Sequence, residues 1–134
     1  MPGVLVDSSV ILDVFLDDPK WAAWSLQKLE ALAGSDQLFI NPLIYAEVSI
    51  GFQRIEELEA AVASAGFRLL AMPKEALFLA GKAFVRYRRN RGVKRSPLPD
   101  FFIGAHAAVQ ELALLTRDPR RVQTYFPTVG LICP

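Results

Sequence analysis

Four acidic residues stand where an ionised side chain is costly to place. Asp7 and Asp118 each follow a short apolar run, in GVLVD and LALLTRD, and Asp100 directly precedes apolar residues in LPDFFI. Glu47 lies in the middle of a helical stripe in NPLIYAEVSIGF. Because a buried charge needs an opposite charge or several hydrogen bonds to compensate its lost hydration, we expect the four carboxylates to share a cation.

The available ligand types favour a hard divalent cation. Mg²⁺ and Mn²⁺ prefer oxygen ligands, and Mg²⁺ commonly engages only one or two carboxylates while it keeps several waters. Zinc is disfavoured because His106 and Cys133 are the only His and Cys of the chain, too few for the usual nitrogen and sulfur ligands. A carboxylate-held Mg²⁺ or Mn²⁺ polarises a phosphate and activates water for in-line displacement. The pattern therefore indicates phosphodiester chemistry.

Each of these residues also has an ordinary structural interpretation. Asp7 or Asp100 could satisfy a helix N-terminus, and Asp118 could belong to a turn. Glu47 could be a solvated residue at the edge of a helix. His106 shares a helical stripe with apolar residues, which favours a packed or hydrogen-bonded imidazole over a catalytic one. The hypothesis of a metal site therefore depends on the four acids taken together.

The acids need a scaffold that brings their elements together. Short apolar runs, typical of strands, alternate with segments of helical periodicity; the runs are residues 4–6, 37–40, 67–72, 113–116 and 129–133. This alternation predicts an α/β sandwich with a mostly parallel central sheet of about five strands flanked by helices. Ligands of such sheets bind beyond the carboxyl ends of the strands, where two of the acids would lie.

Helical periodicity predicts which side chains face the core. In NPLIYAEVSIGF it places Glu47 on one inward stripe with Ile44 and Ile50. In WAAWSLQKLEAL it turns Leu26 inward and Trp24 toward the opposite flank. An exposed aromatic side chain of this kind could anchor a partner protein, or could cover another edge of the same core.

Composition sets the broad class of the protein. With 134 residues, 52% of them hydrophobic, the chain fits a single domain spanning residues 1–134. One cysteine excludes an internal disulfide, and the N-terminus lacks the features of a signal peptide. The most apolar segment, FFIGAHAAVQELALL, is too short and too polar to span a bilayer. We therefore expect a soluble, cytoplasmic protein.

Basic residues gather in the second half of the chain. Residues 1–66 carry ten acids and three bases, and residues 67–134 carry four acids and twelve bases, which favours a polyanionic partner for the second half. The run RYRRNRGVKR, whose Tyr87 could stack on a base, could bind RNA phosphates or could be a solvated helix end. The candidate RNA-binding residues are Arg88, Arg89, Lys94 and Arg95 in this run, with Arg117, Arg120 and Arg121 around the last acid.

LVDSSVILD, YAEVSIG, SPLPDFFIGAHA and LLTRDPRRVQTYFP resemble, in order, the motifs of PIN-domain ribonucleases, in particular the VapC-type toxins of bacterial toxin–antitoxin modules. The resemblance implies a PIN-like three-layer sandwich and an Mg²⁺- or Mn²⁺-dependent endoribonuclease. It also implies a small antitoxin as partner. The residues that match the catalytic, metal-binding pocket of the family are Asp7, Glu47, Asp100 and Asp118, supported by the hydroxyls of Ser9 and Thr116. We also expect a homodimer, the commonest symmetric assembly.

One feature of the sequence departs from the family pattern, and the residues after Asp7 and Leu115 bear on two other protein classes. Some PIN domains carry a further acid shortly after the last Asp, where this chain has Arg120 and Arg121, so the number of metal ions stays open. Aspartyl-phosphate phosphatases need an acid where Ser9 stands, and receiver domains need a Lys at a late strand end where Thr116 and Arg117 stand. The stronger alternative is a non-catalytic PIN-like module that binds RNA or protein.

Overall fold

The computed structural model describes residues 3–91 and 98–134 of the chain. Within these ranges a five-stranded sheet has the order β3-β2-β1-β4-β5, and every neighbouring pair is parallel. The strands are β1 (Gly3–Val6), β2 (Gln37–Ile40), β3 (Phe67–Leu69), β4 (Ala113–Leu115) and β5 (Leu131–Ile132). The predicted α/β fold is confirmed, although β3 ends earlier and β5 begins later than the apolar runs suggested.

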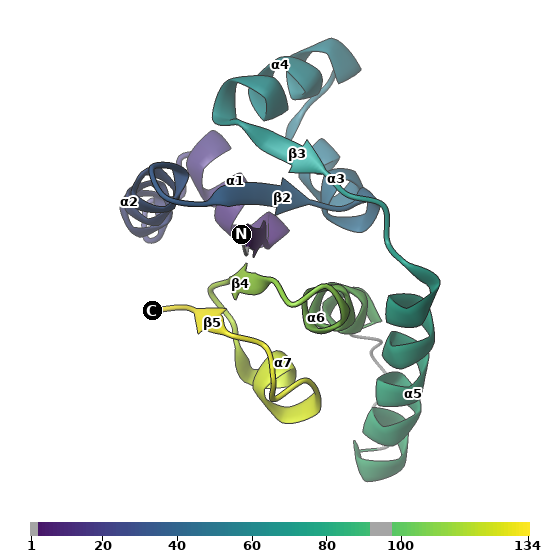
Figure 1. The fold of residues 1–134 in the computed structure, drawn as a ribbon. Helices are drawn as coiled ribbons and strands as arrows, with labels where there is room; N and C mark the ends of the chain where they lie inside the picture. Colours follow the sequence, from purple (N-terminus) through teal and green to yellow (C-terminus); the bar gives the residue numbers. More distant parts are fainter. Residues whose placement is uncertain (1–2, 92–97) are drawn as a thin grey trace.

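Helices connect and flank these strands (Figure 1). They are α1 (Ser8–Phe15), α2 (Ala22–Ala33), α3 (Pro42–Val48), α4 (Ile55–Ala65), α5 (Lys74–Arg91), α6 (Leu98–Val109) and α7 (Arg120–Tyr125), with the short 3-10 helix η1 (Ser49–Gly51) after α3. Helix α4 packs beside β3 at one edge of the sheet, while α5 and α7 both pack against α6. In the described part of the chain, no helix is long and apolar enough to cross a membrane.

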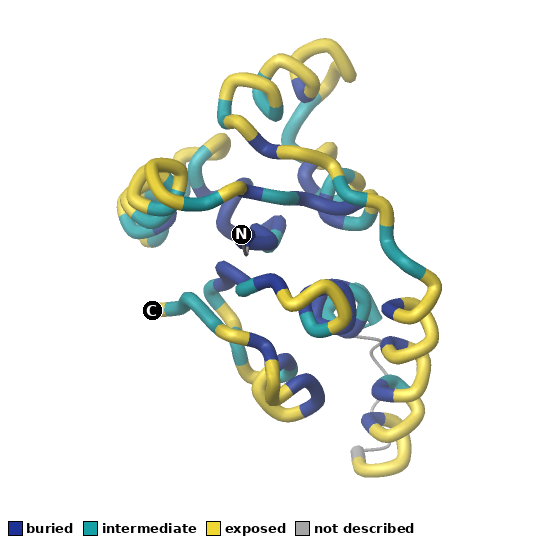
Figure 2. Tube along the Cα trace, in the orientation of Figure 1, coloured by how far each residue is buried: buried dark blue, intermediate teal, exposed yellow. Residues whose placement is uncertain are grey.

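Strand β1 forms the centre of the core. All four of its residues are buried, because β2 and β4 flank it and helices cover the sheet. Figure 2 shows that exposed residues lie mainly on the outer sides of the helices. A strand that is buried on both faces has an uninterrupted apolar sequence, which is why β1 contains no polar residue before Asp7.

An aromatic cluster holds α5, α6 and α7 together. Phe101 of α6 is fully buried, and its ring lies 5.5 Å from that of Tyr87 in α5 and 5.2 Å from that of Tyr125 in α7, centroid to centroid. Edge-to-face packing of this kind stabilises beyond simple burial. The cluster fixes the start of α6, which carries Asp100, relative to α7.

Two predicted helix faces are wrong in part, although Ile44 of α3 is fully buried as expected. Helix α3 ends at Val48, where the chain tightens into η1, so the stripe does not continue and Ile50 is 82% exposed. In α2, Leu26 is 44% exposed, whereas Trp24 packs partly against the core. The face of α2 is set instead by Ser25, which is fully buried through a polar contact with α1.

Candidate active site

The ends of β1 and β4 hold the first carboxylate in place. Residues Val6 and Leu115 are paired in the parallel ladder, and the N–H of Asp7 donates to the carbonyl of Leu115 at 2.9 Å. Both strands therefore end at the same level, which brings the hydroxyl of Thr116 to 2.8 Å from Asp7 Oδ2. Ser9 donates to the same oxygen at 3.2 Å.

Asp7 occupies the N-cap position of α1 but its side chain makes no capping hydrogen bond. The carboxylate accepts from two hydroxyls instead, so the simple capping interpretation of this residue does not hold. Hydroxyl donors orient a carboxylate and partly compensate its charge while they leave it able to meet a cation.

Three of the four acids meet at one small cavity. Asp7, Asp100 and Asp118 line it together with Thr116 and Arg121, and its volume is about 10 Å³, close to the space that one water needs. The fourth acid does not line this cavity, although its pKa responds to two of the three.

Glu47 projects from α3 beside the cavity, where Ser8 donates to its Oε1 at 2.8 Å. Burial raises the pKa of Glu47, and the charges of Asp7 and Asp100 raise it further against the hydrogen bond from Ser8. Each acid therefore lies within electrostatic reach of others, as expected of a cluster that attracts cations.

Electrostatics differ between the two acids nearest α7. Burial and the charge of Asp7 raise the pKa of Asp100, although Arg121 opposes the shift. Hydrogen bonds from Arg120 hold the pKa of Asp118 below its usual range.

Arginines of α7 provide part of the counter-charge. Arg121 Nη1 lies 3.1 Å from Asp100 Oδ2, and Arg120 Nε lies 3.1 Å from Asp118 Oδ1. Both pairs are partly exposed, with 39% to 84% of each side chain accessible to solvent. Solvent screens such pairs, so they are weak enough to exchange partners.

The ligand chemistry of the four acids suits a hard cation better than their present arrangement does. Within residues 3–91 and 98–134, no three His, Cys, Asp or Glu side chains are arranged as a ready metal-ligand set. The donors that surround the cavity are nevertheless carboxylate and hydroxyl oxygens, which are the ligands of Mg²⁺ and Mn²⁺. Arg121 contacts one oxygen of Asp100 and Arg120 contacts both oxygens of Asp118, so a cation at this cavity would compete with these arginines.

A buried ion pair next to the site has no obvious signal in the sequence. Asp13 of α1 is 3% exposed, accepts from Ser25 Oγ at 2.8 Å, and lies 2.8 Å from Arg117 Nε. The Nε–H is not aligned with the carboxylate, so the contact with Arg117 is ionic. The Arg117 guanidinium also lies over the Trp21 ring, 5.3 Å from its centroid. This cluster fastens α1, α2 and the segment between Thr116 and Asp118.

His106 is part of a buried hydrogen-bond chain. Asn41 Nδ2 donates to His106 Nδ1 at 3.0 Å, which leaves Nε2–H to donate to Gln110 Oε1 at 2.5 Å. Burial lowers the pKa of His106, so the ring is neutral. Asn41 also caps α3 through Ile44 N–H. The chain ties α3 to α6, the helices that carry Glu47 and Asp100.

The basic candidates fall into different environments. Arg88 and Arg89 are exposed on α5, whereas Lys94 and Arg95 lie outside the described residues. Arg117 is engaged by Asp13, and the two arginines of α7 contact acids of the site.

Comparison with known proteins identifies similar sequences and folds. The family model of the PIN domain matches residues 4–127, whereas no curated protein matches the sequence. Similar solved structures include VapBC2 from Rickettsia felis bound to a DNA fragment from their promoter (15% identity, TM-score 0.72, 98% of each chain covered). Others are FitAcB from Neisseria gonorrhoeae (19%, 0.72, 96% of each) and a toxin–antitoxin complex from Klebsiella pneumoniae (23%, 0.64, 95% of each).

Proposed function

Because the chain belongs to the PIN-domain family, we propose that it is an Mg²⁺- or Mn²⁺-dependent endoribonuclease that hydrolyses RNA phosphodiester bonds. Proteins of this family are typically nucleases and generally depend on metal. The observation that carries the proposal is the cavity at the ends of β1 and β4, where Asp7, Asp100 and Asp118 meet with Glu47 beside them.

In this proposal Asp7, Glu47, Asp100 and Asp118 hold the cation and are the catalytic residues. The cation supplies Lewis-acid polarisation of the phosphate and a water of lowered pKa. Thr116 and Ser9 orient the carboxylate of Asp7 through their hydroxyls.

Ser8 has the corresponding role for Glu47, because its hydroxyl fixes one carboxylate oxygen. The raised pKa values of Glu47 and Asp100 mean that these two groups retain a proton more readily than free carboxyl groups when no cation is near. Fixed donors of this kind keep the acids in position, so little reorganisation is needed when substrate arrives.

We further propose that the enzyme is the toxin of a toxin–antitoxin pair and acts in the cytoplasm as a homodimer. Support comes from the similar solved structures, which contain toxin–antitoxin complexes. An apolar groove of about 340 Å³ between α1, α2, α4 and β3 offers a surface for a small antitoxin; it is lined by residues that include Val14, Phe15, Leu26, Leu29 and Phe67. Leu26 is the exposed anchor of this surface, in place of Trp24.

A non-catalytic PIN-like module that binds RNA or protein is the second candidate. It is favoured by the pairing of Arg120 and Arg121 with acids of the site and by the absence of a ready ligand set among the described residues. The two candidates differ in metal-dependent cleavage, which only the first requires.

The deciding experiment is incubation of the purified chain with total RNA in Mn²⁺, in Mg²⁺ and in chelator. Asp7→Asn and Asp100→Asn should lower cleavage by more than about 100-fold, since even groups behind the ligands cost about 10–100-fold in such sites. Asp17→Asn is the matched control, because Asp17 is exposed and its positive φ of 52° suits Asn. Equal activity of the wild type with metal and with chelator would refute the proposal.

A further inference from the structure

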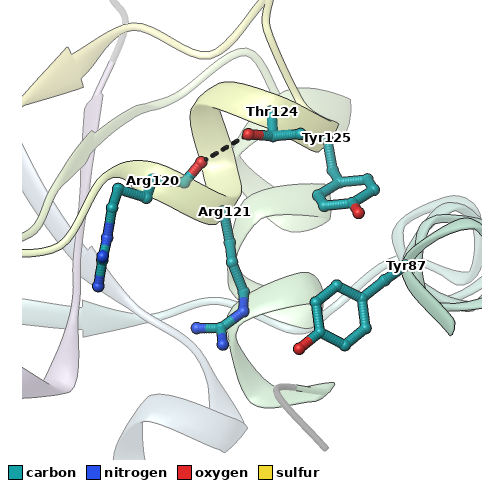
Figure 3. Close-up of a pocket in the computed structure, with 5 residues that line it drawn as sticks. All are labelled: Tyr87, Arg120, Arg121, Thr124 and Tyr125. Atoms are coloured by element: carbon teal, nitrogen blue, oxygen red, sulfur yellow. Dashed lines mark hydrogen bonds between the residues drawn. The ribbon is translucent and has the colours of Figure 1, made fainter. Parts of the chain in front are cut away.

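A second pocket adjoins the acidic cavity and has a different character. It has a volume of about 200 Å³ and is lined by Tyr87, Arg120, Arg121, Thr124 and Tyr125 (Figure 3). Arg121 lines both the pocket and the acidic cavity, so the two sites share a wall. No acidic side chain is among the described residues that line the pocket.

Arginines and tyrosines alternate around this pocket. Arg121 lies over Tyr87, 5.7 Å from the ring centroid, and Arg86 lies over Tyr125 at 5.2 Å. The two rings are 6.1 Å apart and nearly perpendicular, at 69°. Arg121 and Arg86 are therefore each held partly by an aromatic ring rather than by acids alone, which leaves them able to receive an anion.

The exposure of the tyrosines indicates which part of a ligand the pocket receives. Tyr87 is 6% exposed and Tyr125 is 9% exposed, and both rings pack against Phe101. Arg121 and Arg86 cover further ring surface. With their faces occupied, the rings cannot accept a stacked base, so their hydroxyls are the groups that remain to bind a ligand. Phenol and guanidinium groups donate hydrogen bonds, which suits a phosphate, whereas the Thr124 hydroxyl already donates to the carbonyl of Arg120 (Figure 3).

The position of the pocket fits a chain that passes over the acidic cavity. Its volume is smaller than the roughly 300–1,000 Å³ of a pocket for a whole drug-sized molecule, and it suits one phosphate group of a polymer. A phosphodiester next to the cleaved one must lie near the acidic cavity, and four carboxylates there repel it unless cations stand close by.

We propose that the tyrosine–arginine pocket binds the backbone phosphate of an RNA nucleotide adjacent to the one at the acidic cavity. This inference rests on the proposed ribonuclease function and names its neighbouring binding site. Arg120 and Arg121 supply the charge, and the hydroxyls of Tyr87 and Tyr125 supply neutral donors. Arg121 then shifts from Asp100 toward the phosphate, so RNA binding and release of Asp100 are coupled.

The test measures RNA binding without cleavage. Fluorescence anisotropy of a labelled single-stranded RNA of mixed sequence is recorded in chelator over a series of salt concentrations. Arg120→Gln should weaken binding about tenfold and lower the slope of log affinity against log salt by about 0.7. The control is Arg54→Gln, a cation 68% exposed at the start of α4, on the β3 edge of the sheet away from α7, which should change neither quantity.

A second variant distinguishes binding of RNA by the hydroxyl groups of the pocket from general attraction between charges. The double change Tyr87→Phe and Tyr125→Phe removes two hydroxyls but keeps the rings in the aromatic cluster, and should weaken binding about fivefold with an unchanged salt slope. The slope stays constant because no charge is lost. Circular dichroism melting confirms that each variant is folded.

The outcomes separate this inference from the proposed function. If metal-dependent cleavage is absent but both pocket variants bind RNA less well, the pocket stands and the ribonuclease proposal fails. If cleavage occurs and the double variant Tyr87→Phe, Tyr125→Phe binds RNA like the wild type, the proposal for the pocket is refuted and the ribonuclease proposal stands. Loss of binding to a co-purified protein partner, with RNA affinity intact, would assign the pocket to protein and also overturn it.

Discussion

The ion pair between Asp13 and Arg117 should be a main support of the segment that carries Thr116 and Asp118. Arg117→Met keeps much of the apolar stem of the side chain but removes its charge, and leaves the Asp13 carboxylate with the Ser25 hydroxyl alone. Since Asp13 is only 3% exposed, water can compensate the loss of the guanidinium only in part.

The size of the effect follows from the unequal burial of the two partners. Removing one member of a buried pair costs about 3–5 kcal/mol, and the lower end applies here because 30% of the Arg117 side chain is accessible to solvent. Loss of the stacking on Trp21 adds about 0.5 kcal/mol. Asp13→Asn should cost less, about 1–2 kcal/mol, because the freed Arg117 can turn to water.

The measurement is urea unfolding followed by far-UV circular dichroism, since Trp21 fluorescence would report the cluster itself. Arg117→Met should lower the free energy of unfolding by about 3 kcal/mol, or the melting temperature by about 10 °C. The double variant with Asp13→Asn should lose clearly less than the sum of the single losses, by about 1–3 kcal/mol. The reasoning is refuted if the single losses simply add, or if Arg117→Met is as stable as the wild type and only RNA affinity falls, which would make Arg117 an RNA contact.

Two further predictions concern charge and close packing. Because the folded-state pKa values of Glu47 and Asp100 are raised above their ordinary 4.5 and 3.8, the metal-free chain should lose stability as the pH rises from about those values through the raised ones. Glu47→Gln should reduce that loss in melts recorded across pH, and an unchanged profile would contradict the shift. Gly104→Ala should cost about 1–3 kcal/mol, since its Cβ would lie 2.5 Å from Phe126 Cδ2. Gly81→Ala, with nothing within 4 Å of the new Cβ, should instead gain up to about 1 kcal/mol, and similar losses at both positions would exclude packing as the cause.

The strands could be predicted from the sequence most directly at β1, which is buried on both faces. The residues of β1 contain no polar interruption, and a parallel sheet demands this pattern. Asp7, directly after β1, and Asp118, three residues after β4, could then be placed at one edge, and the register of Val6 with Leu115 brings those ends together. Local sequence patterns were sufficient to place these strands and acids, because the backbone pairing of the sheet sets their relative positions.

Helix faces were harder to predict, because periodicity does not reveal polar partners. Ser25 is buried in α2 to meet Asp13, which turns Leu26 outward. Arg117 reaches Asp13 across more than a hundred residues of sequence, and neither residue has a local pattern that indicates the other. His106 could be assigned to the interior from its apolar stripe, but its partner Asn41 depends on how α6 meets α3.

The charge balance of the acidic cavity could not be predicted from the sequence. Four acids in apolar contexts implied a cation, yet Arg120 and Arg121, which depart from the family pattern, already pair with Asp118 and Asp100. Two of the four carboxylates are therefore already compensated in charge by arginines. A metal ion that binds Asp100 and Asp118 would replace their screened ion pairs with the two arginines. Its binding should therefore raise the melting temperature by less than it would at four uncompensated carboxylates. In the proposed function, arginines released by a bound metal would remain at the rim of the site, where a phosphate of the substrate could take the place of the acids.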